Sequence, residues 1–363
     1  MSLLTGKRAA VAVLALAASL SLAVAATPGA TPETDGPVKS LRACAGLYSF
    51  GNGEKIVVGL QPGGTDLYAA RLSTGDVRKL EPAGEQTYRY GPTRDKSTPV
   101  EGSIEFNAGR DGEVTSLRWS QEGGGRGPRG RRVRSEEESV TIPLAGGAAI
   151  SGLLISPPGK GPFPAAVLVT RSDRYDLWQL GMELLDHGIA ILAYDRPAAG
   201  NGAAACRKKD ETACADEARA ALSFARSHAR IDPARAGVVG WGDAGRAAAL
   251  AASEEPGLAF YVDIGGGASP DLDKVRVPAM GIFFQLDAHA SKGTPVSFLR
   301  ALGEAGASDV AVRIFPDADG GGWTVAPGSA GVTGRDPAIF ETIVAWVGTH
   351  TRPKPAKTET SGE

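Results

Sequence analysis

The feature that most constrains this fold is an alternation of apolar runs and helical segments between about residues 136 and 350. Continuous apolar runs such as 165–169 and 189–194 are typical of parallel strands that are buried on both faces. Helical spacing over 177–185 and 337–347 accompanies them. We therefore expect an α/β domain with a doubly wound, mostly parallel sheet, whose sites lie beyond the carboxyl ends of the strands. The other expected strands are 140–144, 149–156, 236–240, 260–264, 279–285 and 310–315, and the other expected helices are 216–228, 246–252 and 298–305.

The preceding part of the chain has a different pattern. Short alternating runs such as 55–60 and 114–119 are separated by Gly, Asn and Asp turns, and no helical period is visible. Such runs are typical of hairpins, so we expect a small antiparallel β domain over 40–122. A Gly- and Arg-rich linker should follow over 123–135. The β domain shows no catalytic constellation, and packing or docking is its expected role.

The first residues have the order of a secretory signal peptide. Lys7 and Arg8 precede an apolar run over 9–22, and Ala23-Val24-Ala25 offers a small-x-small cleavage site. The apolar run is too short to span a bilayer, which favours a cleaved signal over 1–25 rather than an anchor. We therefore expect a secreted or periplasmic protein with no membrane span after signal removal.

Two segments rich in Pro and polar residues, 26–39 and 351–363, are predicted to be a disordered spacer and tail. The formal net charge is only −2, which gives no electrostatic reason to expect a nucleic-acid partner. Three cysteines are present, and Cys206 and Cys214 are close enough in sequence to form a disulfide in an oxidising compartment. Two free thiols are the alternative, and the state of Cys44 stays open. No His/Cys cluster indicates zinc, and we expect no metal and no cofactor.

Several phrases of the second half resemble the α/β-hydrolases, with the resemblance covering about 136–350. The combination with an N-terminal β domain is similar to secreted hydrolases of the serine-aminopeptidase and dienelactone-hydrolase-like groups. The resemblance implies ester or peptide hydrolysis by a Ser-Asp-His triad. The phrases are PPGKGPFPAAVLV (157–169), HGIAILAYDRPAAGNG (187–202), RIDPARAGVVGWGDAG (230–245), VPAMGIFFQLDAHAS and VRIFPDADGGGW.

The nucleophile of that family lies at a sharp strand-to-helix turn of the form G-x-S-x-G. Here the turn reads GWGDAG over 240–245, which places Gly242 at the nucleophile position. Glycine has no side chain for attack, although it relieves the backbone strain of such a turn.

The resemblance also implies positions for the other catalytic groups. Asp287 matches the acid, and Gly320 stands where the family has its histidine. In the oxyanion region, Thr170 and Arg171 replace the usual His-Gly pair. The amide of Asp243, directly after the turn, is the remaining oxyanion donor, although its carboxylate would oppose a developing negative charge there.

The alternative is an active hydrolase whose nucleophile or base lies at other positions. His289 lies two residues beyond Asp287 and is the one candidate surrogate base, because His187, His228 and His350 have positions that favour structural roles. Asp243 would be a carboxylate nucleophile in a shifted register, as in dehalogenase-like relatives.

Two further alternatives are weaker. Ser172 would be a displaced nucleophile, although no histidine is placed to activate it. Asp243, Asp287 and His289 together would be a metal site, although their spacing is not specific for one.

The sequence thus predicts an exported pseudo-hydrolase that binds an unknown small-molecule ligand or a protein partner. The first alternative is an active esterase or peptidase with a relocated nucleophile or base. The second is that the β domain carries the role and the hydrolase half is a scaffold.

Overall fold

A computed structural model describes residues 37–61, 63–110, 112–170, 173–196, 211–267, 269–288, 294–324, 332 and 334–353. The expected signal peptide (1–25) lies outside these residues, and so does most of the expected spacer and tail. The segment Gly36–Glu363 forms one compact unit. None of the helices in the described ranges combines the length and the apolar character that crossing a membrane requires.

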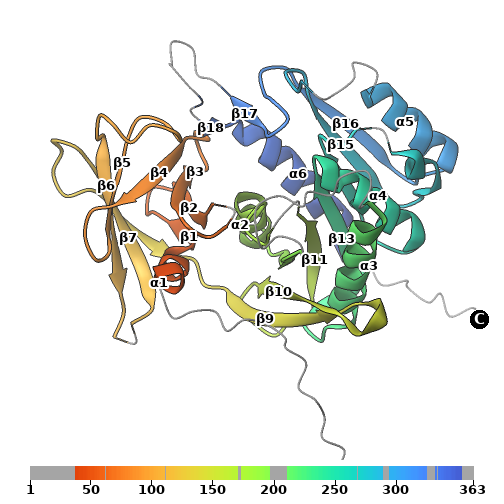
Figure 1. Cartoon of the computed structure of the whole chain (residues 1–363), viewed down its shortest axis with the longest axis horizontal. Coiled ribbons are helices and arrows are strands. Elements are labelled where there is room, and N and C mark those ends of the chain that lie inside the picture. The colour runs from red at the N-terminus through yellow and green to blue at the C-terminus, as the bar shows by residue number, and fades with distance from the viewer. Residues whose placement is uncertain are drawn as a thin grey trace, which may run out of the picture. The chain divides into compact units, whose positions relative to one another are not determined.

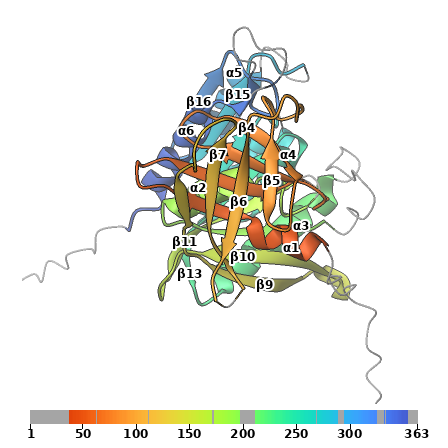
Figure 2. The ribbon, with the colours of Figure 1, turned by 90° about the vertical axis from the view of Figure 1, so that its left-hand side faces the viewer.

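The first part of this unit is a closed antiparallel β-barrel, and the expected antiparallel β domain is confirmed (Figure 2). Side chains that alternate along each strand fill its interior, among them Tyr48, Ile56, Leu67 and Phe106. The barrel strands are β1 (Gly46–Ser49), β2 (Lys55–Leu60), β3 (Leu67–Arg71), β4 (Val77–Pro82), β5 (Thr87–Tyr90), β6 (Gly102–Ala108), β7 (Val114–Gln121) and β8 (Arg129–Arg132), and helix α1 (Pro37–Cys44) precedes them.

The barrel extends beyond its expected limits. Strand β8 lies inside the segment 123–135 that we expected to be a linker, and it closes the barrel by pairing with β1 and β7. The one buried residue of β8 is Gly130, whose Cβ would lie 2.6 Å from the Phe50 ring, so the strand has no apolar alternation that reveals it. Helix α1 likewise begins at Pro37, within the expected spacer 26–39.

The second part is the expected doubly wound α/β sheet, and its fold class is confirmed (Figure 1). The order across the sheet is β9-β10-β12-β11-β13-β14-β15-β16, with β10 antiparallel to both of its neighbours and the remaining pairs parallel. The strands are β9 (Glu136–Pro143), β10 (Ala149–Ser156), β11 (Phe163–Val169), β12 (Ala190–Tyr194), β13 (Ile231–Trp241), β14 (Tyr261–Ile264), β15 (Ala279–Phe284) and β16 (Val310–Phe315).

Helices cover both faces of this sheet. Buried side chains of α3 (Glu211–Ser227), α4 (Asp243–Glu254) and α5 (Thr294–Ala305) share one apolar core with the strands. Those of α2 (Trp178–Asp186) and α6 (Pro337–His350) belong to a second apolar core. This arrangement leaves the carboxyl ends of the parallel strands accessible, where a site is expected.

Barrel residues join the second core and reach the loops around the site. The indole N–H of Trp178 donates to the Val58 carbonyl at 2.9 Å, and Lys55 forms an ion pair with Asp186. A short hairpin of β17 (Trp323–Thr324) and β18 (Gly334–Arg335) is also fixed to the barrel, since the Arg335 N–H donates to the Gly75 carbonyl at 2.9 Å. The barrel therefore helps to position the hairpin that carries Arg335.

Candidate functional site

The turn between β13 and α4 has the geometry of a nucleophile elbow. Gly242 stands alone between the strand and the helix, with φ 60° and ψ −132°. Its N–H donates to the Ile264 carbonyl at 2.7 Å, and its own carbonyl accepts from the Gly245 N–H at 2.9 Å. An L-residue with a side chain is strained in this conformation by about 1–3 kcal/mol, a cost that glycine does not bear.

A buried carboxyl packs directly behind the elbow. Asp263, in β14, accepts a hydrogen bond from the Gly266 N–H at 3.0 Å. A Cβ at Gly245 would lie only 2.1 Å from the Asp263 Oδ1, so this position of α4 has room only for glycine. Burial raises the pKa of Asp263 to about 8. This residue was not predicted from the sequence, because an aspartate inside an apolar strand carries no local signal of its packing.

The positions that match the acid and the histidine face each other. Asp287 follows β15, and Gly320 lies in the turn after β16. A Cβ on Gly320 would lie 2.8 Å from both Cγ and Oδ2 of Asp287. A side chain at position 320 would therefore point straight at the carboxyl group, and it would require that group to move.

Trp241 holds the turn of Gly320 in this place. Its indole N–H donates to the Gly320 carbonyl at 2.9 Å, and its ring stacks on Phe284 with a centroid distance of 6.1 Å. The Arg335 guanidinium lies 5.4 Å from the Trp241 ring centroid and 4.1 Å from that of Trp323. The hairpin of β17 and β18 is thus tied to the elbow through aromatic and cation–π contacts.

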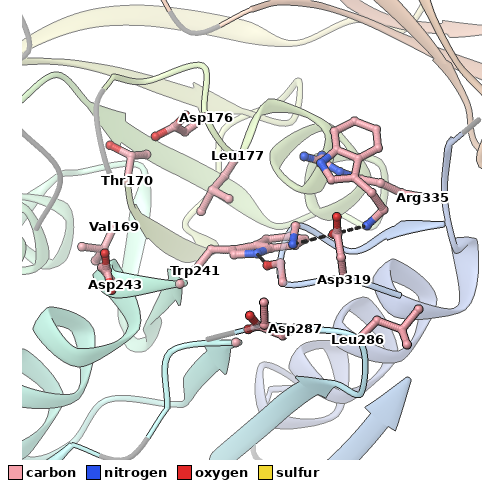
Figure 3. Close-up of a pocket in the computed structure, with 16 residues that line it drawn as sticks. Val169, Thr170, Asp176, Leu177, Trp241, Asp243, Leu286, Asp287, Asp319 and Arg335 are labelled. Carbon is pink, nitrogen blue, oxygen red and sulfur yellow. Dashed lines mark hydrogen bonds between the residues drawn. The ribbon is translucent and has the colours of Figure 1, made fainter. Parts of the chain in front are cut away.

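These residues surround one cavity of about 630 Å³ at the carboxyl ends of the strands (Figure 3). Gly242, Asp287 and Gly320 all line it, as do Thr170 and Asp243. The lining residues that the sequence analysis did not single out are Val169, Asp176, Leu177, Trp241, Gly265, Leu286, Ala288, Asp319, Gly321, Trp323 and Arg335. Trp323 and Arg335 were missed because a hairpin brings them to the elbow from more than 80 residues away in the chain.

The oxyanion-region residues are only partly described. Thr170 is buried, and its hydroxyl donates to the Tyr194 carbonyl at 3.4 Å, while Arg171 lies outside the described residues. Asp243 is the first residue of α4, with its side chain 54% exposed and its Oδ1 3.7 Å from Arg246 Nη2. The elbow conformation thus occurs at Gly242 and not at Asp243.

The three described histidines interact with groups outside the cavity. His187 contacts the Glu183 carbonyl, His228 lies 3.3 Å from Glu138, and His350 lies 3.0 Å from Asp309. None of the three lines the cavity.

Other candidates fall partly outside the described ranges. His289, Ser172 and Cys206 lie outside the described residues, whereas Cys214 is disulfide-bonded and Cys44 is buried. Among the residues that the structure describes, no three His, Cys, Asp or Glu side chains are grouped to hold a metal ion.

The strand order and the elbow define the α/β-hydrolase fold. No family model matches the chain. The esterase FrsA of Enterobacter sp. (strain 638) is 32% identical over 75 residues, which cover 19% of this chain and only 18% of the esterase.

Solved structures with a similar fold include dienelactone-hydrolase-like proteins. A dienelactone hydrolase from Anabaena variabilis ATCC 29413 is 21% identical, with a TM-score of 0.48 over 60% of this chain and 99% of that chain. A dienelactone-hydrolase-like promiscuous phosphotriesterase from metagenomic libraries is 18% identical, with a TM-score of 0.47 over 60% of this chain and 98% of that chain.

Proposed function

We propose that this chain is a catalytically degenerate member of the hydrolase fold that binds a small ligand in the cavity beside Gly242. The proposal rests on two glycines, Gly242 and Gly320, that occupy catalytic positions of the hydrolase fold in backbone geometry suited to catalytic side chains. Gly242 has the elbow conformation, and the Cβ direction of Gly320 points at the Asp287 carboxyl group. These positions support the proposal that the backbone framework of a triad remains while two of its three side chains are missing.

The loss of chemistry follows from what these side chains do. Without a hydroxyl at position 242 no acyl intermediate forms there, and without a base at position 320 no proton is removed from a nucleophile. Loss of one triad member costs on the order of 10⁴–10⁶ in rate, and loss of a second adds little. The described lining offers one hydroxyl, that of Thr170, which donates to a main-chain carbonyl.

The cavity supports ligand binding in place of turnover. A volume of about 630 Å³ lies within the range of small-molecule sites, about 300–1,000 Å³. Trp241 and Trp323 supply apolar surface, while Asp287 and Arg335 supply charges of both signs. We further propose that the chain acts after export, on the basis of the signal-like order of residues 1–25.

The test is turnover of a small panel by the purified mature chain. The panel contains p-nitrophenyl acetate, p-nitrophenyl butyrate, dihydrocoumarin and alanine p-nitroanilide, and each compound is also tested for thermal stabilisation of the protein. We expect stabilisation by at least one compound and turnover far below an ordinary kcat of about 10 s⁻¹. An ordinary kcat that His289→Ala abolishes would instead establish the relocated-site alternative.

A further inference from the structure

A second cavity lies at one end of the barrel, remote in sequence from the elbow. Its volume is about 350 Å³. Glu54, Arg71 and Trp119 line it together with the glycine-rich turn between β7 and β8. An adjoining cavity of about 360 Å³ shares Arg71, Trp119 and Gln121 with it. The mouths of β-barrels are one of the places where small-molecule sites recur.

The alternation of the strands explains why polar groups gather here. Ile56, Val58 and Leu60 point into the barrel, and the same alternation carries one step back to Glu54. Leu67 and Ala69 on β3 lead in the same way to Arg71. Interior-facing positions thus change from apolar to polar at this end. Both charged side chains are partly exposed, so their convergence on the cavity gives it a polar lining that a ligand can reach.

One carboxylate oxygen in this cavity still requires a donor. The Glu54 Oε2 accepts from Arg71 Nη2 at 3.0 Å and from the Ser73 hydroxyl at 2.7 Å. The Glu54 Oε1 is buried and accepts no hydrogen bond of normal geometry from the described residues, although the backbone N–H of Lys55 lies near enough to help lower the pKa of this carboxyl group. A buried acceptor that lacks a well-placed donor is destabilising, and a ligand O–H or N–H would supply that donor.

The charges of the two cavities select among ligand classes. Glu54 and Arg71 balance each other in the first cavity. The adjoining cavity adds Arg78 but also Asp76, Glu101 and Glu122, so carboxylates exceed guanidiniums and an anionic ligand is disfavoured. Trp119 contributes a partly buried indole ring, which packs against Tyr90 at a centroid distance of 4.7 Å and lies 6.0 Å from the Arg71 guanidinium. Asn52 and Gln121 contribute amides.

We propose that this barrel mouth binds a neutral sugar ring, either a free monosaccharide or the end unit of a glycan. A sugar presents an apolar C–H face to Trp119 and hydroxyl groups that donate to Glu54 and accept from Arg71. In the glycine-rich turn, a Cβ at Gly125 would meet no atom within 4 Å, so this position faces open space from which a ligand can approach. This site is independent of the cavity beside Gly242.

The experiment follows the Trp119 indole N–H by ¹H–¹⁵N NMR of the full mature chain. Glucose, galactose, mannose and N-acetylglucosamine are titrated singly to about 50 mM, well above a Kd of about 1 mM, followed by malto- and chito-oligosaccharides. Trp119→Phe assigns the indole signal, and Trp346→Phe, on α6, is the matched control. We expect a saturable shift of the Trp119 signal with at least one sugar.

The two sources of the sugar give different results. Saturation by a monosaccharide identifies a free sugar, and saturation by an oligosaccharide alone identifies a glycan end. In either case Glu54→Gln, which keeps the size of the side chain and one acceptor, should weaken binding at least tenfold, and Trp346→Phe should leave it unchanged. The proposal is overturned by the absence of a saturable shift with every sugar, or by affinity that Glu54→Gln leaves unchanged.

Discussion

Adding one methyl group at Gly320 tests the geometry on which the account depends. In Gly320→Ala the new Cβ would lie 2.8 Å from Cγ and Oδ2 of Asp287, closer than real Cβ contacts allow. Overpacking of this kind costs about 1–3 kcal/mol, and because the carboxyl group can rotate we expect a loss of about 1–2 kcal/mol in the free energy of unfolding. Urea unfolding of the mature chain measures it.

The control is Gly51→Ala, whose Cβ would meet no atom within 4 Å and whose φ, like that of Gly320, is not left-handed. We expect this change to stay within about 0.5 kcal/mol. Removing the carboxyl group with Asp287→Ala should relieve the collision, so the double variant should be more stable than the sum of the single losses by at least about 0.5 kcal/mol. Additivity of the two changes within about 0.3 kcal/mol would refute the facing arrangement.

Three further predictions concern stability. The pKa of buried Asp263 is raised to about 8, so the native state holds this proton longer than the unfolded state and stability falls as pH rises from about 4 to about 8. In Asp263→Asn, the free energy of unfolding measured in urea should fall less steeply over this window, by up to about 1 kcal/mol per pH unit. Part of the pH dependence should remain, because burial also raises the pKa of Glu183 to about 8. An unchanged slope would contradict this. Gly242→Ala should cost about 1–3 kcal/mol because of its φ of 60°, and a neutral result in urea unfolding would refute a strained elbow. Cys214→Ser should lower the free energy of unfolding by about 2–3 kcal/mol, and no loss under oxidising conditions would argue against a stabilising short-loop disulfide.

The fold was largely predictable because the signals that specify it are local. Buried parallel strands such as β11 are continuous apolar runs, and their order along the chain alternates with helices of clear period. The barrel was only partly predictable. Strand β8 consists of Arg129, Gly130, Arg131 and Arg132, and its single buried residue is a glycine, so neither hydrophobic alternation nor β propensity marks it.

The residues of the candidate site likewise include some that the sequence predicts and some that it does not. Gly242, Asp287 and Gly320 follow strands whose ends meet at one edge of the sheet, so their register could be predicted from short phrases around them. Arg335 and Trp323 could not be predicted, since their place depends on a hairpin that bonds to the barrel at Gly75. Neither could the contact of Asp263 with Gly245, which exists only once α4 packs on β14.

The most direct test of the central claim is the intact mass of the mature wild-type chain after exposure to a fluorophosphonate. Trypsin treated in parallel shows that the reagent is active, and heat-denatured protein controls for unspecific modification. We expect no change in mass, because Gly242 offers no hydroxyl at the elbow. A single adduct on one serine of the folded wild-type chain would contradict it and would establish an active hydrolase with a relocated nucleophile.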